Sequence, residues 1–154
     1  MTELAYRSGR SQEADIRKHL TACNDQFMPP LASRVSIPEY ARRLASNATC
    51  FEAWSGNELV GLVAAYCNAP DRFEAFVTNV SVLPSWTGQG IASRLMRDCI
   101  GHIDEKGFER IRLEVDGNAA EAIRIYRAVG FKAEEAQGSK FSMYLELNGK
   151  SENE

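Results

Sequence analysis

The segment VTNVSVLPSWTGQGIASRLM, residues 77–96, decides the fold. It begins as an apolar, β-branched run typical of a buried strand, and after Pro84 its apolar residues recur at helical spacing. Gly88 and Gly90 stand between the two patterns, where glycine allows a ligand to approach the backbone closely. Several backbone N–H groups then point outward at the positive end of the helix. Such a turn suits a diphosphate, although the same glycine pair also fits a tight structural turn.

The residues before this turn predict two helices and four strands. A short apolar start at residues 4–6 is the first predicted strand. Apolar residues then recur at helical spacing from Ile16 through Leu20 and Cys23 to Phe27, which predicts the first helix. An S-x-x-E capping box at Ser36 predicts a second helix that runs to about residue 45. Short apolar runs broken by turn residues then predict strands near residues 49–54, 58–67 and 73–83, the first two joined as an antiparallel hairpin.

The residues after the turn alternate between helix and strand. We expect a helix from Ile91 that Gly107 ends, a strand over 110–115, a helix from Asn118 to about Val129, and strands near 131–136 and 140–147. The order βααβββαβαββ predicts an α/β (α+β) fold with a mixed, mostly antiparallel central sheet of about seven strands flanked by four helices. Residues 1–148 form one domain in this interpretation, and residues 149–154 form a frayed tail.

Composition narrows the function. The chain has 154 residues, enough for one ordinary core, and a net charge of −3, which argues against nonspecific nucleic-acid binding. No apolar run approaches the ~20 residues of a membrane span, and the start lacks a secretory signal, so we expect a cytoplasmic protein. The four cysteines lie far apart in apolar sequence, which predicts reduced, packed thiols. Neither His19 nor His102 has metal-ligand spacing, so no metal is expected.

Two nucleotide-binding motifs fail at the glycine turn. A Walker-type loop would need a lysine followed by a hydroxyl residue, and the chain has no such motif. A G-x-G-x-x-G dinucleotide turn would need a third glycine where Ser93 stands.

The turn instead resembles the Q/R-x-x-G-x-G/A signature of the GNAT acyl-CoA N-acyltransferases. Val82-Leu83-Pro84 followed by residues 87–92, TGQGIA, carries that likeness, with Thr87 where the family usually has Gln or Arg. Residues 118–131 resemble the family's second signature, N-x-x-A-x-x-x-Y-x-x-x-G-F, if its alanine is read at Ala122. The pairing of Glu114 with Tyr126 is also similar to the N-terminal acetyltransferases that act on ribosomal proteins.

The resemblance implies an acetyl-CoA cosubstrate and a set of site residues. Tyr126 would be the acid that protonates the leaving thiolate and Glu114 the base, with a backbone N–H near Val82 at the oxyanion. Each has a plainer alternative, because Tyr126 lies on an apolar helical stripe and a strand-end carboxylate is often simply solvated. Glu74, Asn79 and Ser81 remain alternatives for the base, the last two as water holders. The coenzyme would contact Val82, Leu83, Thr87, Gly88, Gln89, Gly90, Ile91, Ala92, Ser93, Asn118 and Tyr126.

Asn118 also begins an N-x-x-E pattern, which by itself predicts a helix N-cap box with Glu121.

The acceptor would be the primary amine of a small molecule or a peptide N-terminus, bound near Phe27, Arg34 and Asn79. Trp54, Tyr66 and Tyr144 could line its pocket or belong to the core. A noncatalytic acyl-CoA sensor and a nucleotide-binding regulatory domain remain alternative functions. A homodimer through the apolar last strand, Phe141 to Leu147, is also possible.

Overall fold

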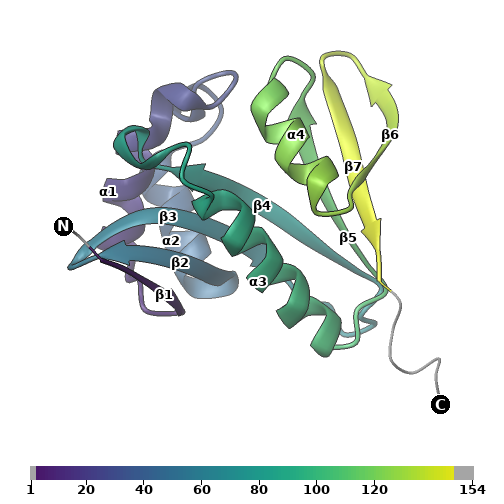
Figure 1. The fold of residues 1–154 in the computed structure, drawn as a ribbon, viewed down its shortest axis with the longest axis horizontal. Coiled ribbons are helices and arrows are strands. Elements are labelled where there is room, and N and C mark those ends of the chain that lie inside the picture. Colours follow the sequence, from purple (N-terminus) through teal and green to yellow (C-terminus); the bar gives the residue numbers. More distant parts are fainter. Residues whose placement is uncertain (1–2, 148–154) are drawn as a thin grey trace.

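The computed structural model describes residues 3–147 as a seven-stranded sheet in the order β1-β2-β3-β4-β5-β7-β6, with helices on both faces (Figure 1). Neighbouring strands are antiparallel except β4 and β5, which are parallel. The strands are β1 (Leu4–Ser8), β2 (Thr49–Ser55), β3 (Glu58–Tyr66), β4 (Glu74–Val82), β5 (Arg110–Asp116), β6 (Lys132–Gln137) and β7 (Lys140–Glu146). The helices are α1 (Glu13–Cys23), α2 (Ile37–Asn47), α3 (Ile91–Glu105) and α4 (Ala120–Ala128). The mixed, mostly antiparallel sheet with four helices is therefore confirmed.

Strand β3 separates two hydrophobic cores. Leu62 and Ala64 pack in the core beneath α1 and α2, whereas Val63 and Ala65 pack in the core beneath α3 and α4. A strand buried on both faces gives such an alternation, because successive side chains point to opposite sides of the sheet. Figure 1 shows α3 and α4 in front of the sheet, with α1 and α2 behind it.

Helix α3 lies unusually close to the sheet at Gly61. A Cβ atom built on Gly61 would lie 2.7 Å from the side chain of Ile91 and 3.3 Å from that of Leu95. Both contacted side chains are buried, so they have little room to move. Glycine at position 61 therefore sets the depth at which the first turn of α3 rests on β3.

Strands β4 and β5 diverge after a short contact. Their parallel pairing covers only Glu74–Phe76 against Arg110–Arg112. On its other edge β4 contains a bulge, since Ala64 pairs with Asn79 and Ala65 with Val77, which leaves Thr78 without an opposite residue. In Figure 1 the two strands meet near the end of β7 and open into a V. The divergence leaves the edges of β4 and β5 that face each other unpaired over the rest of their length.

A buried carboxylate fixes the connection between β1 and α1. Glu52 of β2 is fully buried, and its Oε1 accepts hydrogen bonds from the Arg10 backbone N–H (3.0 Å) and from Trp54 Nε1 (3.0 Å). Its Oε2 accepts from the Ser11 backbone N–H (2.9 Å) and the Ser11 hydroxyl (2.6 Å). Four donors compensate the cost of burying this charge. Trp54 is thus a core residue on the α1 side.

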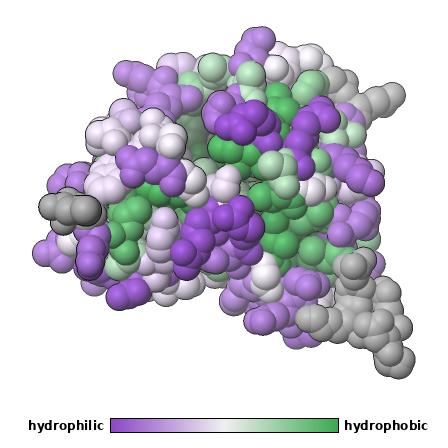
Figure 2. All heavy atoms as spheres, viewed as in Figure 1, coloured by the Kyte–Doolittle hydropathy of each residue, from purple (hydrophilic) through white to green (hydrophobic). Residues whose placement is uncertain are grey.

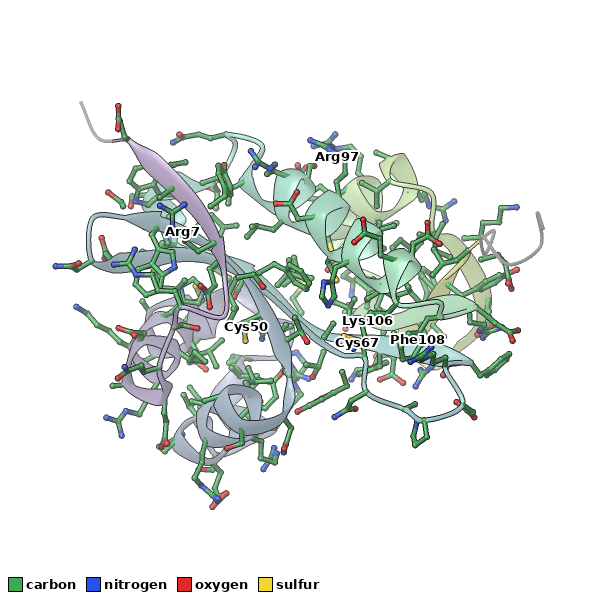
Figure 3. All side chains as sticks on the ribbon, turned by 90° about the horizontal axis from the view of Figure 1, so that it is seen from below. Arg7, Cys50, Cys67, Arg97, Lys106 and Phe108 are labelled. Carbon is green, nitrogen blue, oxygen red and sulfur yellow. The ribbon has the colours of Figure 1, made fainter. Side chains whose placement is uncertain are left out.

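The four cysteines are buried and unpaired, as the sequence predicts. Burial raises the pKa of the Cys23 and Cys50 thiols to about 12 and also raises that of Cys99. Figure 3 shows Cys50 and Cys67 inside the molecule, whereas Arg7 and Arg97 point outward.

Two helix boundaries differ from the sequence expectation. Helix α1 ends at Cys23, and a short 3₁₀ turn over Asn24–Gln26 places Phe27 outside the helix. Helix α4 begins at Ala120 with Ala119 at the N-cap and no side-chain cap, so the N-cap box predicted at Asn118 is wrong. Glu121 pairs instead with Arg124, because these side chains are neighbours on the helix surface. The N-cap predicted at Ser36 is confirmed, since its hydroxyl accepts from the Glu39 N–H.

The last strand does not offer a free edge for a homodimer. Strand β7 pairs with β5 on one side and with β6 on the other. Among the described residues, the outer strands of the sheet are β1 and β6. The predicted frayed tail, residues 149–154, lies outside the described residues. Within residues 3–147 no helix has both the length and the apolar character that a membrane crossing requires.

Replacing the buried carboxylate should destabilise the fold. In Glu52→Gln an NH2 group takes the place of one acceptor oxygen and faces N–H or O–H donors, which leaves buried donors unsatisfied. We expect the free energy of unfolding to fall by about 1–3 kcal/mol. Urea denaturation would measure it, with the exposed Glu58→Gln on β3 as the matched control. Equal stability of the two variants would contradict the role given to Glu52.

Candidate active site

Two adjoining cavities fill the space between β4, β5 and α4. The first, the α3-side cavity, has a volume of about 280 Å³ and lies between Val80–Val82 of β4, Ala92 of α3 and one side of α4. The second, the β5-side cavity, has a volume of about 330 Å³ and lies between β4 and residues Leu113–Asp116 of β5. Both are lined by Phe27, Met28, Val80 and Tyr126. The two cavities therefore meet at Tyr126.

Apolar side chains are exposed at the surface near the two cavities. In Figure 2 apolar residues reach the surface between α3 and α4, whereas hydrophilic residues cover the outer side of α3. Met28 is one of the large apolar side chains that stay exposed, at 50%, and it lines both cavities.

The glycine turn stands beside the α3-side cavity. Gly88 and Gly90 have φ angles of +80° and +81°, which side chains other than glycine rarely adopt. The Thr87 hydroxyl donates to the Pro84 carbonyl (3.0 Å) and closes the turn, and residues 87–90 are exposed. Because the first N–H groups of a helix have no partner within it, the amides of Ile91, Ala92 and Ser93 at the start of α3 can bind an anion.

Strand β4 directs backbone donors into the gap. The Leu83 N–H donates to the Val60 carbonyl of β3 (2.9 Å). Because backbone groups alternate along a strand, the N–H groups of Val82 and Val80 point to the opposite edge, from which β5 has diverged. The oxyanion donor expected near Val82 thus has a second candidate in Val80.

Tyr126 is the residue at the junction of the cavities. Its side chain is 7% exposed and packs near Phe131, with ring centroids 6.2 Å apart. Burial raises the pKa of its phenol to about 12. The hydroxyl therefore stays protonated at neutral pH and can act as a proton donor.

The β5-side cavity carries charges of both signs. Glu114 and Asp116 of β5 line it together with the exposed Arg34 from the loop between α1 and α2 and with Lys140 of β7. The Glu114 carboxylate, 46% exposed, accepts a hydrogen bond from Arg112 (3.2 Å). This cavity can hold a polar, charged molecule next to Tyr126.

The structure gathers some of the predicted residues and separates others. Phe27, Arg34, Asn79, Glu114 and Tyr126 line the β5-side cavity, and Val82, Ala92, Ser81 and Tyr126 line the α3-side cavity. Asn118 is exposed and lines neither cavity; its backbone N–H donates to Asp116 Oδ1 (2.8 Å).

Three further candidates lie away from the junction. Glu74 is held in ion pairs with Arg110 (3.0 Å) and Arg112 (3.3 Å) where β4 and β5 still pair. Tyr66 packs against the core beneath α1 and α2. Tyr144 lines a third cavity, of about 680 Å³, over β7 and β6.

Tyr40 was missed by the sequence interpretation. It lines the β5-side cavity, and its hydroxyl donates to the Thr78 carbonyl (2.9 Å) while lying 2.8 Å from the Thr78 hydroxyl. Tyr40 thus holds the bulge that bends β4. In the sequence it only continues the apolar stripe of α2, so no local signal distinguishes it from a core residue.

His19 was also missed as a residue connected with the site. It is 3% exposed, and its ring nitrogens lie 3.0 Å from the Leu59 carbonyl and 2.9 Å from the Ser81 hydroxyl. Burial lowers the pKa of His19 to about 4, so the ring is neutral at neutral pH.

Comparison with known proteins identifies a family. Residues 14–131 match the family model described as Acetyltransferase (GNAT) family. An uncharacterized N-acetyltransferase of Bacillus subtilis, YvbK, is 25% identical over 100 residues, which are 65% of this chain and 61% of that protein. The matched segments span between 41% and 61% of the length of the curated relatives.

Two solved structures share the fold. The PaiA N-acetyltransferase of Thermoplasma acidophilum, in complex with coenzyme A, has a TM-score of 0.73 at 19% identity and covers 94% of this chain and 99% of its own. The ribosomal-protein-S18-alanine N-acetyltransferase of Escherichia coli has a TM-score of 0.74 at 20% identity and covers 99% of both chains.

The buried His19 should make stability depend on pH. The folded protein holds His19 at a pKa of about 4, below the ordinary 6.5, so below pH 6.5 the unfolded chain binds the extra proton first. The free energy of unfolding therefore keeps its full value above pH 6.5. It falls by about 3 kcal/mol as the pH drops towards 4. Urea denaturation across this range should show a shallower loss for His19→Asn than for the wild type. Parallel pH profiles would contradict this account.

Proposed function

Because the chain belongs to the acetyltransferase (GNAT) family, we propose that it is an N-acetyltransferase that moves an acetyl group directly from acetyl-CoA to a primary amine. The observation that supports this most is the meeting of two cavities at one buried phenol. One cavity lies beside a row of outward backbone amides, and the other carries the acidic side chains. Donor and acceptor can therefore reach Tyr126 from opposite sides in one ternary complex.

The α3-side cavity fits the coenzyme. Amides of the Gly88–Gly90 turn and the first turn of α3 would hold its pyrophosphate, and neither glycine has a protein atom within 4 Å of a built Cβ, which leaves the turn open to a ligand. One of the outward N–H groups of Val80 and Val82 would bind a polar group of its pantetheine arm where β5 is absent, and the other would face the thioester oxygen. Thr87 lacks the long side chain usual in the family, so the backbone amides carry most of the anion binding. The acetyl group then lies near Tyr126.

Acyl transfer requires a neutral amine. An alkylamine with a pKa of about 10.4 is mostly protonated at neutral pH, and deprotonating it there costs roughly 4 kcal/mol. Glu114, on the rim of the β5-side cavity, would accept that proton directly or through a water held by Asn79. The N–H of Val82 or Val80 would stabilise the oxyanion, and the Tyr126 hydroxyl would protonate the departing thiolate.

The acceptor would enter the β5-side cavity beneath the loop that carries Phe27 and Arg34. Phe27, Met28, Leu31 and Val35 give it an apolar wall. Glu114 and Asp116 offer carboxylates to an amine, and Arg34 and Lys140 of the same cavity offset their charge. Either the amine of a small molecule or a peptide N-terminus fits this combination. The similar E. coli structure is named for the alanine of ribosomal protein S18. A short peptide with an N-terminal alanine (an alanine-led peptide) is therefore a suitable first probe.

Ligand-induced stabilisation tests the coenzyme site. Acetyl-CoA and coenzyme A should each raise the melting temperature in thermal denaturation, by an amount equivalent to about 2.7 kcal/mol at 100 times the dissociation constant. ATP and NAD should have smaller effects, because they lack the arm that β4 would bind. Gly90→Ala, which strains a residue at φ +81°, should weaken the shift. A larger shift with ATP or NAD would reject the proposal in favour of a nucleotide-binding domain.

Removing the phenol hydroxyl tests the catalytic assignment. Tyr126→Phe should lower kcat for acetylation of a short alanine-led peptide or of phenethylamine by about 10²–10⁴-fold, because it removes the proposed general acid. Stabilisation by acetyl-CoA should persist. Tyr66→Phe, on the other side of the sheet, is the matched control and should retain activity. Wild-type binding of acetyl-CoA without turnover of any amine would point to a sensor domain.

A further inference from the structure

A buried row of polar side chains connects α1 with the wall of the active-site cavities. His19 of α1 is 3% exposed and lines neither cavity, whereas Ser81 and Asn79 of β4 are 7% and 4% exposed. Ser81 Oγ lies 2.9 Å from His19 Nε2 and 2.8 Å from Asn79 Oδ1, an amide atom whose assignment as oxygen or nitrogen depends on the surrounding hydrogen bonds. Ser81 lines the α3-side cavity and Asn79 the β5-side cavity. His19 has no part in the proposed transfer of the acetyl group or of protons.

The proton on the His19 ring can be assigned by its partners. The Leu59 carbonyl, 3.0 Å from Nδ1, can only accept a hydrogen bond, so Nδ1 must carry the hydrogen. With its pKa lowered to about 4 by burial, the ring carries only one proton at neutral pH. Nε2 is therefore bare and accepts a hydrogen bond.

This assignment determines the direction of the remaining hydrogen bonds. Ser81 has one hydroxyl proton, and the bare Nε2 at 2.9 Å takes it; the Cys23 thiol, 3.7 Å from Nε2, is a weaker competitor. Ser81 then has no proton for Asn79, so the Asn79 amide must donate its NH2 to Ser81. A half turn of the amide exchanges its oxygen and nitrogen and meets this requirement. The Asn79 oxygen then faces the β5-side cavity.

The opposite direction has a clear physical penalty. If Ser81 donated to Asn79, Nε2 would have to donate to Ser81 while Nδ1 still donated to Leu59. That arrangement needs a charged imidazolium in a fully buried position. It would also present the Asn79 NH2 group, a donor, to an amine that offers N–H groups of its own.

We propose that His19 is a positioning residue, which through Ser81 holds the Asn79 amide with its oxygen towards the acceptor amine. The oxygen then accepts a hydrogen bond from one N–H of the amine and turns the nitrogen lone pair towards the thioester. The Tyr40 hydroxyl also contacts the Asn79 side chain, and its proton is directed at the Thr78 carbonyl (2.9 Å). This inference rests on the proposed acetyltransferase function for its catalytic part, and on the hydrogen-bond geometry alone for its proton assignment.

The proton assignment can be tested without any activity. In the full chain labelled with ¹⁵N-histidine, the nitrogen chemical shifts of His19, identified by their loss in His19→Asn, distinguish a protonated from a bare ring nitrogen. We expect a protonated Nδ1 and a bare Nε2 between pH 6 and pH 9. A protonated Nε2, in either the neutral or the charged ring, would overturn the inference whatever the protein catalyses.

Kinetics test the consequence for the acceptor. Ser81→Ala breaks the connection while leaving His19 bonded to Leu59, and it should raise KM for phenethylamine or the alanine-led peptide about tenfold, which corresponds to one hydrogen bond. The KM for acetyl-CoA should change less than twofold. His19→Leu, which removes both ring nitrogens, should have the same effect as Ser81→Ala if the protein folds.

His19→Gln is the conservative control, because its amide offers one donor for Leu59 and one acceptor for Ser81. We expect it to restore the amine KM to within about threefold of the wild type. A Gln variant as impaired as the Leu variant, or an unchanged amine KM in Ser81→Ala, would overturn the positioning role. If the wild type acetylates neither probe, the proposed function fails at its acceptor, while the nitrogen shifts still decide the proton assignment.

Discussion

The divergence of β4 from β5 is the constraint on which the rest of the molecule depends. Two parallel strands that separate after three residue pairs leave backbone N–H and C=O groups without partners inside the protein. The Thr78 bulge bends β4 away, and the Tyr40 hydroxyl holds the bulge from the α2 side. The unpaired edge is then free to bind a ligand that itself carries amide groups, as the pantetheine arm of coenzyme A does. The protein thus forgoes hydrogen bonds along part of its sheet, and the proposed coenzyme site lies at that edge.

The position of α3 relative to that edge depends on Gly61, which has no side chain. Gly61 lets Ile91 and Leu95 rest directly on β3, and Ile91 is the first residue of the helix. The amides that would bind the pyrophosphate therefore sit on a helix whose depth is set by the core. Hydrophobic packing and the proposed anion site are connected through Gly61, a residue that lines neither cavity.

Much of this architecture could be predicted from the sequence, and what could not depends on contacts distant in the chain. The spacing of apolar residues and the positions of turn residues located each strand and α-helix, and the glycine pair at residues 88 and 90 indicated the turn proposed to bind an anion. The failed prediction at Asn118 came from reading a local capping pattern where the loop directs the backbone N–H of Asn118 to Asp116 instead. Tyr40, Val80 and His19 gave no local signal, because their roles arise from the bulge, the strand divergence and a hydrogen bond across 62 residues. The order of the strands in the sheet could not be predicted from the sequence either. The position of β7 between β5 and β6 was therefore not expected.

The burial of all four thiols bears on how the protein tolerates its own chemistry. Each proposed turnover would release coenzyme A, a free thiol that forms mixed disulfides readily under oxidising conditions. Such exchange needs an accessible thiolate on the protein, and none of the four cysteines is more than 5% exposed. Cys23 and Cys50, with pKa values raised to about 12, are protonated as well as hidden. The folded chain should therefore remain chemically inert towards its product, and a thiol-reactive dye added to a working reaction would report released coenzyme rather than protein.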